Sequence, residues 1–114
     1  MPSRIYLGEL EELVLLMVAL LNTKAYGVSI AEQLKKQAGR EISISAIHAV
    51  LHRLEEKGFV KSRMGGASQE RGGRRKRLFT LTPAGSRILH EVRSVRESLW
   101  SRILPQALPK IDMA

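Results

Sequence analysis

The stretch "SISAIHAVLHRLEEKGFV", residues 43–60, decides the fold of this 114-residue chain. Ser43 is a good helix N-cap, and Gly58 is the residue type that most often follows the end of a helix. Between them, apolar residues recur at helical spacing and predict one buried stripe: Ile47, Val50, Leu51 and Leu54. The opposite face begins with short or polar side chains: Ser45, Ala46, His48 and Ala49, with His52 one turn further on. A face of this kind suits close approach to another surface.

The sequence after this helix predicts a β-hairpin with a long tip. "FVKSRM" at 59–64 and "RLFTL" at 77–81 are rich in β-branched and aromatic residues, and the glycine-rich segment 65–76 joins them. Thr82 and Pro83 then form an N-cap followed by proline at the first helical position, where its missing N–H costs nothing. The charged tip is therefore anchored at both ends and is not a basic tail.

Three further helices are predicted around this central segment. Residues 7–22 are apolar nearly all round, which is typical of a helix in a core or an interface, and residues 28–38 are amphipathic. The last helix, about 83–103, carries an apolar stripe longer than a domain of this size can bury, so we expect a partner to cover it: Ile88, Val92, Val95, Leu99 and Ile103. The predicted fold is mainly α with a small β-hairpin. It comprises a winged helix-turn-helix domain over residues 1–82, a C-terminal dimerisation helix over 83–104 and a frayed tail over 105–114.

Positive charge is concentrated at the hairpin. The formal net charge is +8, and 7 of the 19 Lys and Arg residues lie within residues 61–80, against one acidic residue, Glu70. An α-helix fits the major groove of B-DNA, about 12 Å wide, while a basic hairpin beside it can lie along phosphates or enter the minor groove. We therefore predict contacts with double-stranded DNA. The recognition helix would contribute Ser43, Ser45, Ala46, His48, Ala49 and His52, and the wing Arg71, Arg74, Arg75, Lys76 and Arg77.

Four segments of the chain resemble the PadR-like transcriptional regulators. They are "LGELEELVL" at 7–15, "YGVSIAEQL" at 26–34, "SISAIHAVLHRLEEKGFV" at 43–60 and "GGRRKRLFTLTPAG" at 72–85. The four segments follow the order and spacing of that family, and the resemblance as a whole covers about residues 7–104. The chain differs from the family's usual pattern at His48, where the family has tyrosine, and at Arg77-Leu78-Phe79, where the family has a Lys-Tyr-Tyr run.

This resemblance implies a prokaryotic, cytoplasmic protein associated with the nucleoid, which forms a homodimer through its first and last helices. Members of the family act mostly as repressors, and small molecules relieve some of them. Compact members carry a tryptophan in the last helix that stacks on flat hydrophobic compounds at the dimer interface. The resemblance therefore implies an aromatic effector near Trp100, with apolar contributions from Leu13 or Met17.

Two other classes of protein remain open from the residues alone. A basic component of a ribonucleoprotein would also carry this charge, but such proteins stack bases on aromatic side chains, and only 4% of this chain is aromatic. An interaction protein could instead form a heterodimer through the last helix.

We predict no enzyme, no metal and no cofactor, because no acid orients a Ser45–His48 pair and the His48–His52 pair has no obvious third ligand. The chain has no cysteine, which is compatible with a reducing cytosol. Its longest apolar run has nine residues, 13–21, too short for a membrane span, and its start does not resemble a signal peptide.

Overall fold

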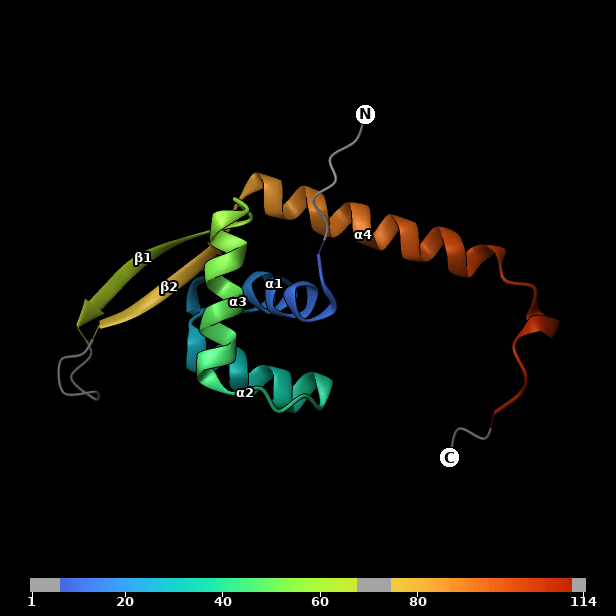
Figure 1. The fold of residues 1–114 in the computed structure, drawn as a ribbon, viewed down its shortest axis with the longest axis horizontal. Helices are drawn as coiled ribbons and strands as arrows, with labels where there is room; N and C mark the ends of the chain where they lie inside the picture. The colour runs from blue at the N-terminus through green and yellow to red at the C-terminus, as the bar shows by residue number, and fades with distance from the viewer. Residues whose placement is uncertain (1–6, 68–74, 112–114) are drawn as a thin grey trace.

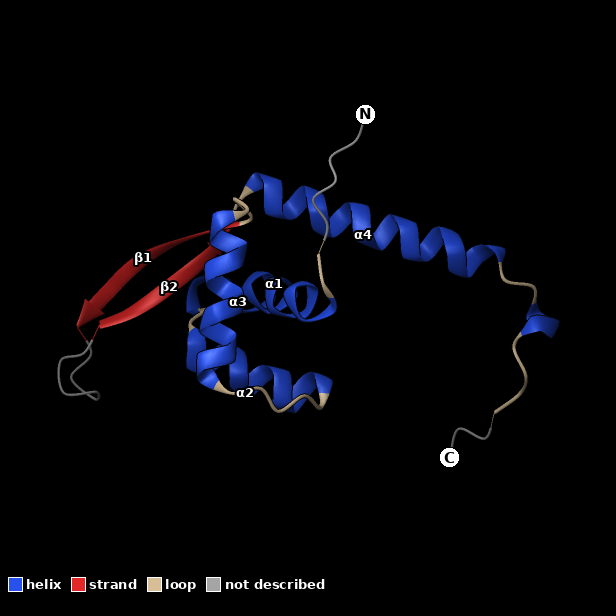
Figure 2. Cartoon of the chain, viewed as in Figure 1, coloured by secondary structure: helices blue, strands red, loops and turns tan. Residues whose placement is uncertain are grey.

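The computed structural model describes residues 7–67 and 75–111. The elements follow in the order α1 (Glu9–Leu21), η1 (Asn22–Lys24), α2 (Gly27–Ala38), α3 (Ile44–Glu56), β1 (Val60–Ala67), β2 (Arg75–Leu81), α4 (Pro83–Arg102) and η3 (Pro105–Ala107). Helices make up most of the chain, and one antiparallel hairpin projects from the helical body (Figures 1 and 2). The predicted fold class, a mainly α winged helix with a long last helix, is confirmed.

The predicted helix caps are present. The Ser43 hydroxyl accepts a hydrogen bond of 3.2 Å from the N–H of Ala46, and the Thr82 hydroxyl accepts one of 3.0 Å from the N–H of Gly85. Gly58, which follows the C-cap residue Lys57 of α3, has a φ of 82°, a conformation that few residues other than glycine adopt. The strands are longer than the sequence predicted, because β1 runs on to Ala67 and β2 begins at Arg75.

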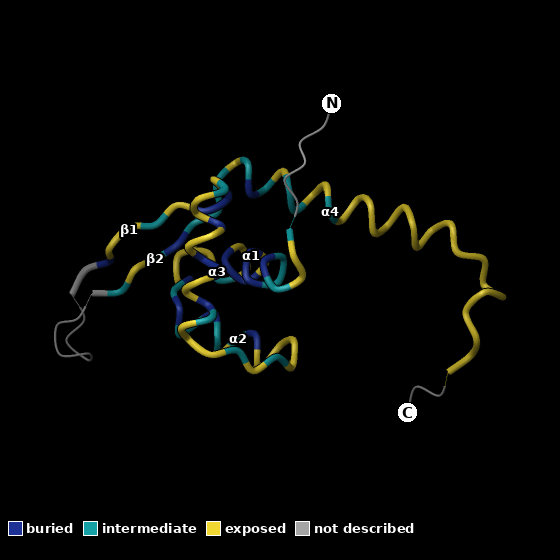
Figure 3. Tube along the Cα trace, viewed as in Figure 1, coloured by how far each residue is buried: buried dark blue, intermediate teal, exposed yellow. Residues whose placement is uncertain are grey.

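Helices α1, α2 and α3 pack around one core, which lies at the centre of the body in Figure 3. The predicted stripe of α3 is buried in full and meets residues of the other two helices. The largest fully buried side chains are Leu15, Ile30, Leu34, Ile47, Leu51 and Leu54. Phe59, Val60 and Phe79 add the base of the hairpin to the same core, so the hairpin is fixed to the helical body rather than hanging from it.

The hairpin also joins the connection between α1 and α2. The backbone N–H of Phe79 donates a 2.9 Å hydrogen bond to the carbonyl of Ala25, which places that connection along β2. In the register of the hairpin, Ser62 pairs with Phe79 and Met64 pairs with Arg77. Since side chains alternate along a strand, these four residues share one face of the hairpin, the face that Phe79 buries in the core.

Helix α4 begins against the body and then leaves it. The Thr82 hydroxyl donates a 2.6 Å hydrogen bond to the carbonyl of Gly58, and Thr82 N–H donates one of 3.1 Å to the carbonyl of Phe59. Ile88 and Leu89 pack against the core, but nearly all residues from 91 onward are exposed (Figure 3). The helix therefore extends as an arm beyond the domain (Figure 1).

Candidate nucleic-acid interface

The outward face of α3 is exposed where the sequence predicted a recognition surface. Ser43, Ser45, His48, Ala49 and His52 are exposed, and Ala46 is half-buried. Ser43 has a structural role as well, because its hydroxyl caps the helix and lies 3.5 Å from the hydroxyl of Ser45. Ser45, Ala46 and Ala49 are small, so another backbone can approach this face of the helix closely, whereas Ile44 at its start is a large apolar side chain that is 41% exposed.

Two basic side chains in the outer half of β2 are tied to the helical body. The Lys76 ammonium lies 3.4 Å from the Tyr26 hydroxyl and 4.4 Å from the centroid of the Tyr26 ring, a cation–π contact. Arg77 donates a 3.0 Å hydrogen bond to the Ser62 hydroxyl, which in turn donates one of 2.8 Å to the Glu55 carboxylate of α3. The sequence indicated the cations but gave no signal for Tyr26, Ser62 or Glu55 as their partners.

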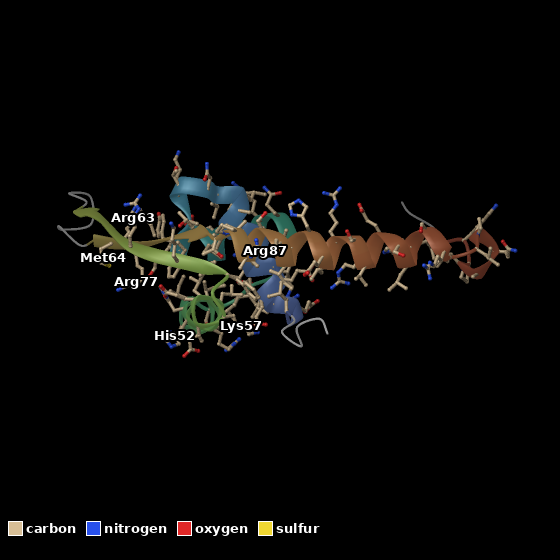
Figure 4. All side chains as sticks on the ribbon, turned by 90° about the horizontal axis from the view of Figure 1, so that it is seen from above. His52, Lys57, Arg63, Met64, Arg77 and Arg87 are labelled. Carbon is tan, nitrogen blue, oxygen red and sulfur yellow. The ribbon has the colours of Figure 1, made fainter. Side chains whose placement is uncertain are left out.

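The other predicted wing residues are only partly covered by the structure. Arg71 and Arg74 lie outside the described residues, and Arg75 begins β2. Figure 4 shows Arg77 on the side of the hairpin where α3 lies and Arg63 on the opposite side. Both faces of the hairpin therefore carry positive charge.

A cleft of about 280 Å³ separates α3 from β2. Its lining consists of His48, His52, Glu55, Arg77 and Phe79. The cleft thus brings two predicted recognition residues next to one predicted wing residue. Gly27, at the start of α2, lies against the His48 ring. A Cβ atom on Gly27 would lie 2.5 Å from Nε2 of His48, so only glycine lets the imidazole ring rest on the backbone of α2.

A buried carboxylate braces the recognition helix from behind. Glu11 is 7% exposed, and both of its oxygens lie 2.9 Å from the Lys57 ammonium at the end of α3. It also accepts a 2.8 Å hydrogen bond from the N–H of Gly8, and the Arg53 guanidinium lies 3.5 Å away. Burial alone would raise the pKa of Glu11, but the hydrogen bonds from Gly8 and Lys57 and the two nearby cations outweigh it and lower the pKa below its ordinary value. The charged carboxylate therefore holds α1 against α3.

A second hollow lies between α1 and α4, away from the wing. This groove has a volume of about 840 Å³, and its lining includes Leu16, Arg93 and Trp100, whose side chain is 65% exposed. Arg96 crosses the groove to Glu12 in a 2.8 Å ion pair, and the hydrogen bond with that carboxylate raises the pKa of Arg96.

The structure brings Trp100 together with Leu16 and not with the two α1 residues named from the resemblance. Met17 is 7% exposed and belongs to the core, while Leu13 packs partly against it. Of the predicted interface stripe, Ile88 packs on the domain and Val92 is half-buried. Val95 and Leu99 are exposed, and Ile103 is partly so.

Within residues 7–67 and 75–111, no three His, Asp or Glu side chains form a group that could hold a metal ion. None of the helices in these ranges is long and apolar enough to cross a membrane.

A capped helix with an exposed polar face, a basic hairpin beside it and a helix pair behind it define the class: a winged helix-turn-helix protein. Residues 15–91 match the sequence model of the transcriptional regulator PadR-like family, and the chain belongs to that family. It is therefore a DNA-binding transcriptional regulator and not an enzyme, as the sequence predicted.

Solved structures agree with this assignment. A PadR family transcription regulator from Clostridium difficile R20291 is 25% identical, with a TM-score of 0.68, over 90% of this chain and 100% of that one. A PadR family regulator from Eggerthella lenta DSM 2243 is also 25% identical, with a TM-score of 0.64, over 82% of this chain and 80% of that one. A PadR-like regulator from Bacillus cereus ATCC 14579 shares the fold at 17% identity, with a TM-score of 0.70, over 89% of this chain and 93% of that one. No curated protein matches the chain significantly.

Proposed function

We propose that the protein is a repressor that binds a pseudo-palindromic DNA operator as a homodimer in the cytoplasm of a prokaryote. The observation that carries the proposal is the position of α3 and the hairpin, which present a polar helix face and fixed cations on adjoining surfaces. A two-fold dimer would place two α3 helices about 34 Å apart, one turn of B-DNA. The helix would enter the major groove, and the wing would meet flanking phosphates or the minor groove.

The exposed half of α4 supports the dimer. Val95 and Leu99 are each 60% exposed, and Leu20 of α1 is 63% exposed, although leucine and valine are usually buried. A second copy of the chain would cover these side chains by pairing α4 with α1 and α4 of its partner. A heterodimer would use the same residues. Gel filtration and sedimentation of the purified chain alone distinguish the two arrangements, because a homodimer gives twice the monomer mass and a chain that needs a different partner gives the monomer mass.

The groove beside Trp100 is the proposed site of a small aromatic effector. The exposed Trp100 indole offers a stacking surface in a groove that the apolar Leu16 also lines, and a dimer would enclose it further. Binding there would alter the separation of the two α3 helices and release the operator. Quenching of Trp100 fluorescence by planar aromatic compounds tests this site, and no quenching at tens of micromolar would count against it.

DNA binding is tested with duplexes from the region upstream of the protein's own gene. If each subunit neutralises three or four phosphates, log K falls with log salt at a slope of roughly −5 to −7, whereas a slope near −1 would remove the wing from the interface. Arg74→Glu with Arg75→Glu should weaken binding to all duplexes alike, and Ser45→Ala should change the preference among them. Stronger binding to single-stranded RNA than to any duplex would favour the ribonucleoprotein alternative.

A further inference from the structure

The cleft between α3 and β2 differs from the rest of the basic surface, because its cation already has an acidic counterpart. Arg77 is linked through the Ser62 hydroxyl to Glu55, with hydrogen bonds of 3.0 Å and 2.8 Å. The positive charge of the guanidinium and the negative charge of the carboxylate offset each other inside the cleft. With both histidines neutral, the cleft therefore carries no net charge to attract an anion.

The two histidines that line the cleft can change this balance. Histidine is the side chain whose charge ordinarily changes between pH 5 and pH 8. His52 already faces an acid, since its Nε2 lies 3.6 Å from the Glu56 carboxylate. His48 makes no ion pair with a carboxylate within the described part of the chain, and it lies against the backbone of Gly27. A proton on His48 is therefore the charge that turns the cleft positive.

We infer that this cleft binds a backbone phosphate of duplex DNA between Arg77 and a protonated His48, so that each subunit takes up a proton when it binds DNA. The inference rests on the proposed DNA-binding function. The groups that face His48 are consistent with it. From α3 they are His52 and Glu55, from β2 Arg77, and from α2 the uncharged backbone of Gly27. Lys76, the residue before Arg77 in β2, contacts Tyr26 instead and does not line the cleft.

The geometry also assigns different roles to the two histidines. A protonated His52 is compensated by Glu56 whether DNA is present or not, so its charge adds little that depends on binding. Glu55 lines the same cleft but is hydrogen-bonded to Ser62, and no carboxylate of the described residues forms an ion pair with His48, so the incoming phosphate supplies the counter-charge of a protonated His48. His48 is thus the residue that couples affinity to pH, whereas Ser62 and Glu55 are positioning residues that keep Arg77 at the cleft.

The test measures the affinity of the full chain for a fluorescein-labelled, mixed-sequence DNA duplex of about 30 base pairs by anisotropy, at constant ionic strength. Proton uptake by both subunits should make binding about tenfold tighter at pH 6 than at pH 8. His48→Gln should reduce this ratio to less than about twofold, and the matched variant His52→Gln should keep most of it. Both variants retain His90 and the N-terminal amine, so any titration of those groups cancels in the comparison.

A second measurement needs no variant and covers the case in which His48→Gln fails to fold. For the wild-type protein, the slope of log K against log salt should be steeper at pH 6 than at pH 8 by about 0.9 for each additional phosphate neutralised. A wild-type affinity that changes less than twofold between these pH values, or an equal pH dependence in His48→Gln, would overturn the inference and leave the proposed function intact. Failure to bind any duplex at either pH would instead overturn the proposed function.

Discussion

Replacing Glu11 by glutamine should destabilise the protein by about 2 kcal/mol, because the brace between α1 and α3 depends on charge. Glutamine keeps the shape of the side chain and can still accept the hydrogen bond from Gly8, but it loses the ion pair with Lys57. Hydrogen bonds to charged groups contribute about 1.5–3 kcal/mol, and removing one partner of a fully buried pair costs about 3–5 kcal/mol. The Lys57 side chain is 30% exposed, so water can solvate its ammonium when Glu11 is replaced. The cost should therefore fall in the range of about 1.5–3 kcal/mol and not in the range for a fully buried pair.

Urea denaturation followed by circular dichroism at fixed protein concentration measures this loss of unfolding free energy. The matched control is Glu41→Gln, since the carboxylate of Glu41 is 80% exposed and its 3.6 Å pairing with Lys35 should contribute less than about 0.5 kcal/mol. Lys57→Met should cost at least as much as Glu11→Gln because it leaves a buried carboxylate without its main partner. The double variant should cost less than the sum of the two, by about 1 kcal/mol. A loss below 0.5 kcal/mol for Glu11→Gln would refute the role of the brace.

The same carboxylate gives the wild type a defined sensitivity to acid. The pKa of Glu11 is lower in the folded protein than its ordinary value of 4.5, since the hydrogen bonds and cations outweigh burial. Its contribution to stability is therefore complete above that ordinary pKa and is lost as the pH falls through the lower pKa of the folded state. Denaturation midpoints measured between pH 6 and pH 3 should fall less steeply in Glu11→Gln than in the wild type, and parallel curves would contradict this.

Three further changes test other parts of the fold. Gly85→Ala should lower the unfolding free energy by about 2–3 kcal/mol in urea denaturation, because the new Cβ would overlap the backbone carbonyl of Phe59. A loss below 1 kcal/mol would show that α4 can shift on the domain to make room. Gly27→Ala should change stability by less than about 1 kcal/mol, because the new Cβ meets only the exposed ring of His48, which can turn toward solvent. The displaced ring should weaken DNA binding in anisotropy, and unchanged affinity would place it outside the interface. In the proposed homodimer, Leu99→Asp should convert the dimer to a monomer in sedimentation while leaving the helical circular dichroism spectrum intact, and a persistent dimer would exclude Leu99 from the interface.

The sequence predicted the framework of the fold because each signal is local. Ser43 and Thr82 are caps whose partners lie three residues away, and the stripe of α3 has a clear helical period. The hairpin was recognised from composition, but its strands extend further than predicted. At their outer ends β1 carries the glycines Gly65 and Gly66, and β2 carries charged residues, which sequence rules assign to a loop.

The sequence could not decide which residue of α1 faces Trp100. Helix α1 is apolar nearly all round, so its sequence pattern does not show which face of the helix packs in the core. Neighbouring apolar residues such as Leu16 and Met17 therefore cannot be told apart from the sequence. Their separation in the structure arises from tertiary packing: Met17 turns into the core of α2 and α3, while Leu16, one residue earlier, is 44% exposed beside Trp100. A site that depends on the choice between adjacent apolar residues is thus visible only once the helices are packed.

The departure of Arg77-Leu78-Phe79 from the family's usual Lys-Tyr-Tyr run also has a physical account. Phe79 is 3% exposed, so an aromatic ring still anchors the base of the wing in the core. Leu78 points to the opposite face of the strand, where its side chain lies 3.1 Å from the position a Cβ on Gly65 would take. Arg77 shares the face of Phe79 and is held there by Ser62. The sequence therefore shows how many cations the wing carries. Which of them faces the recognition helix depends on the alternation of side chains along β2. Among the wing side chains that the structure describes, Arg77 faces α3, and two hydrogen bonds through Ser62 join it to Glu55 of that helix.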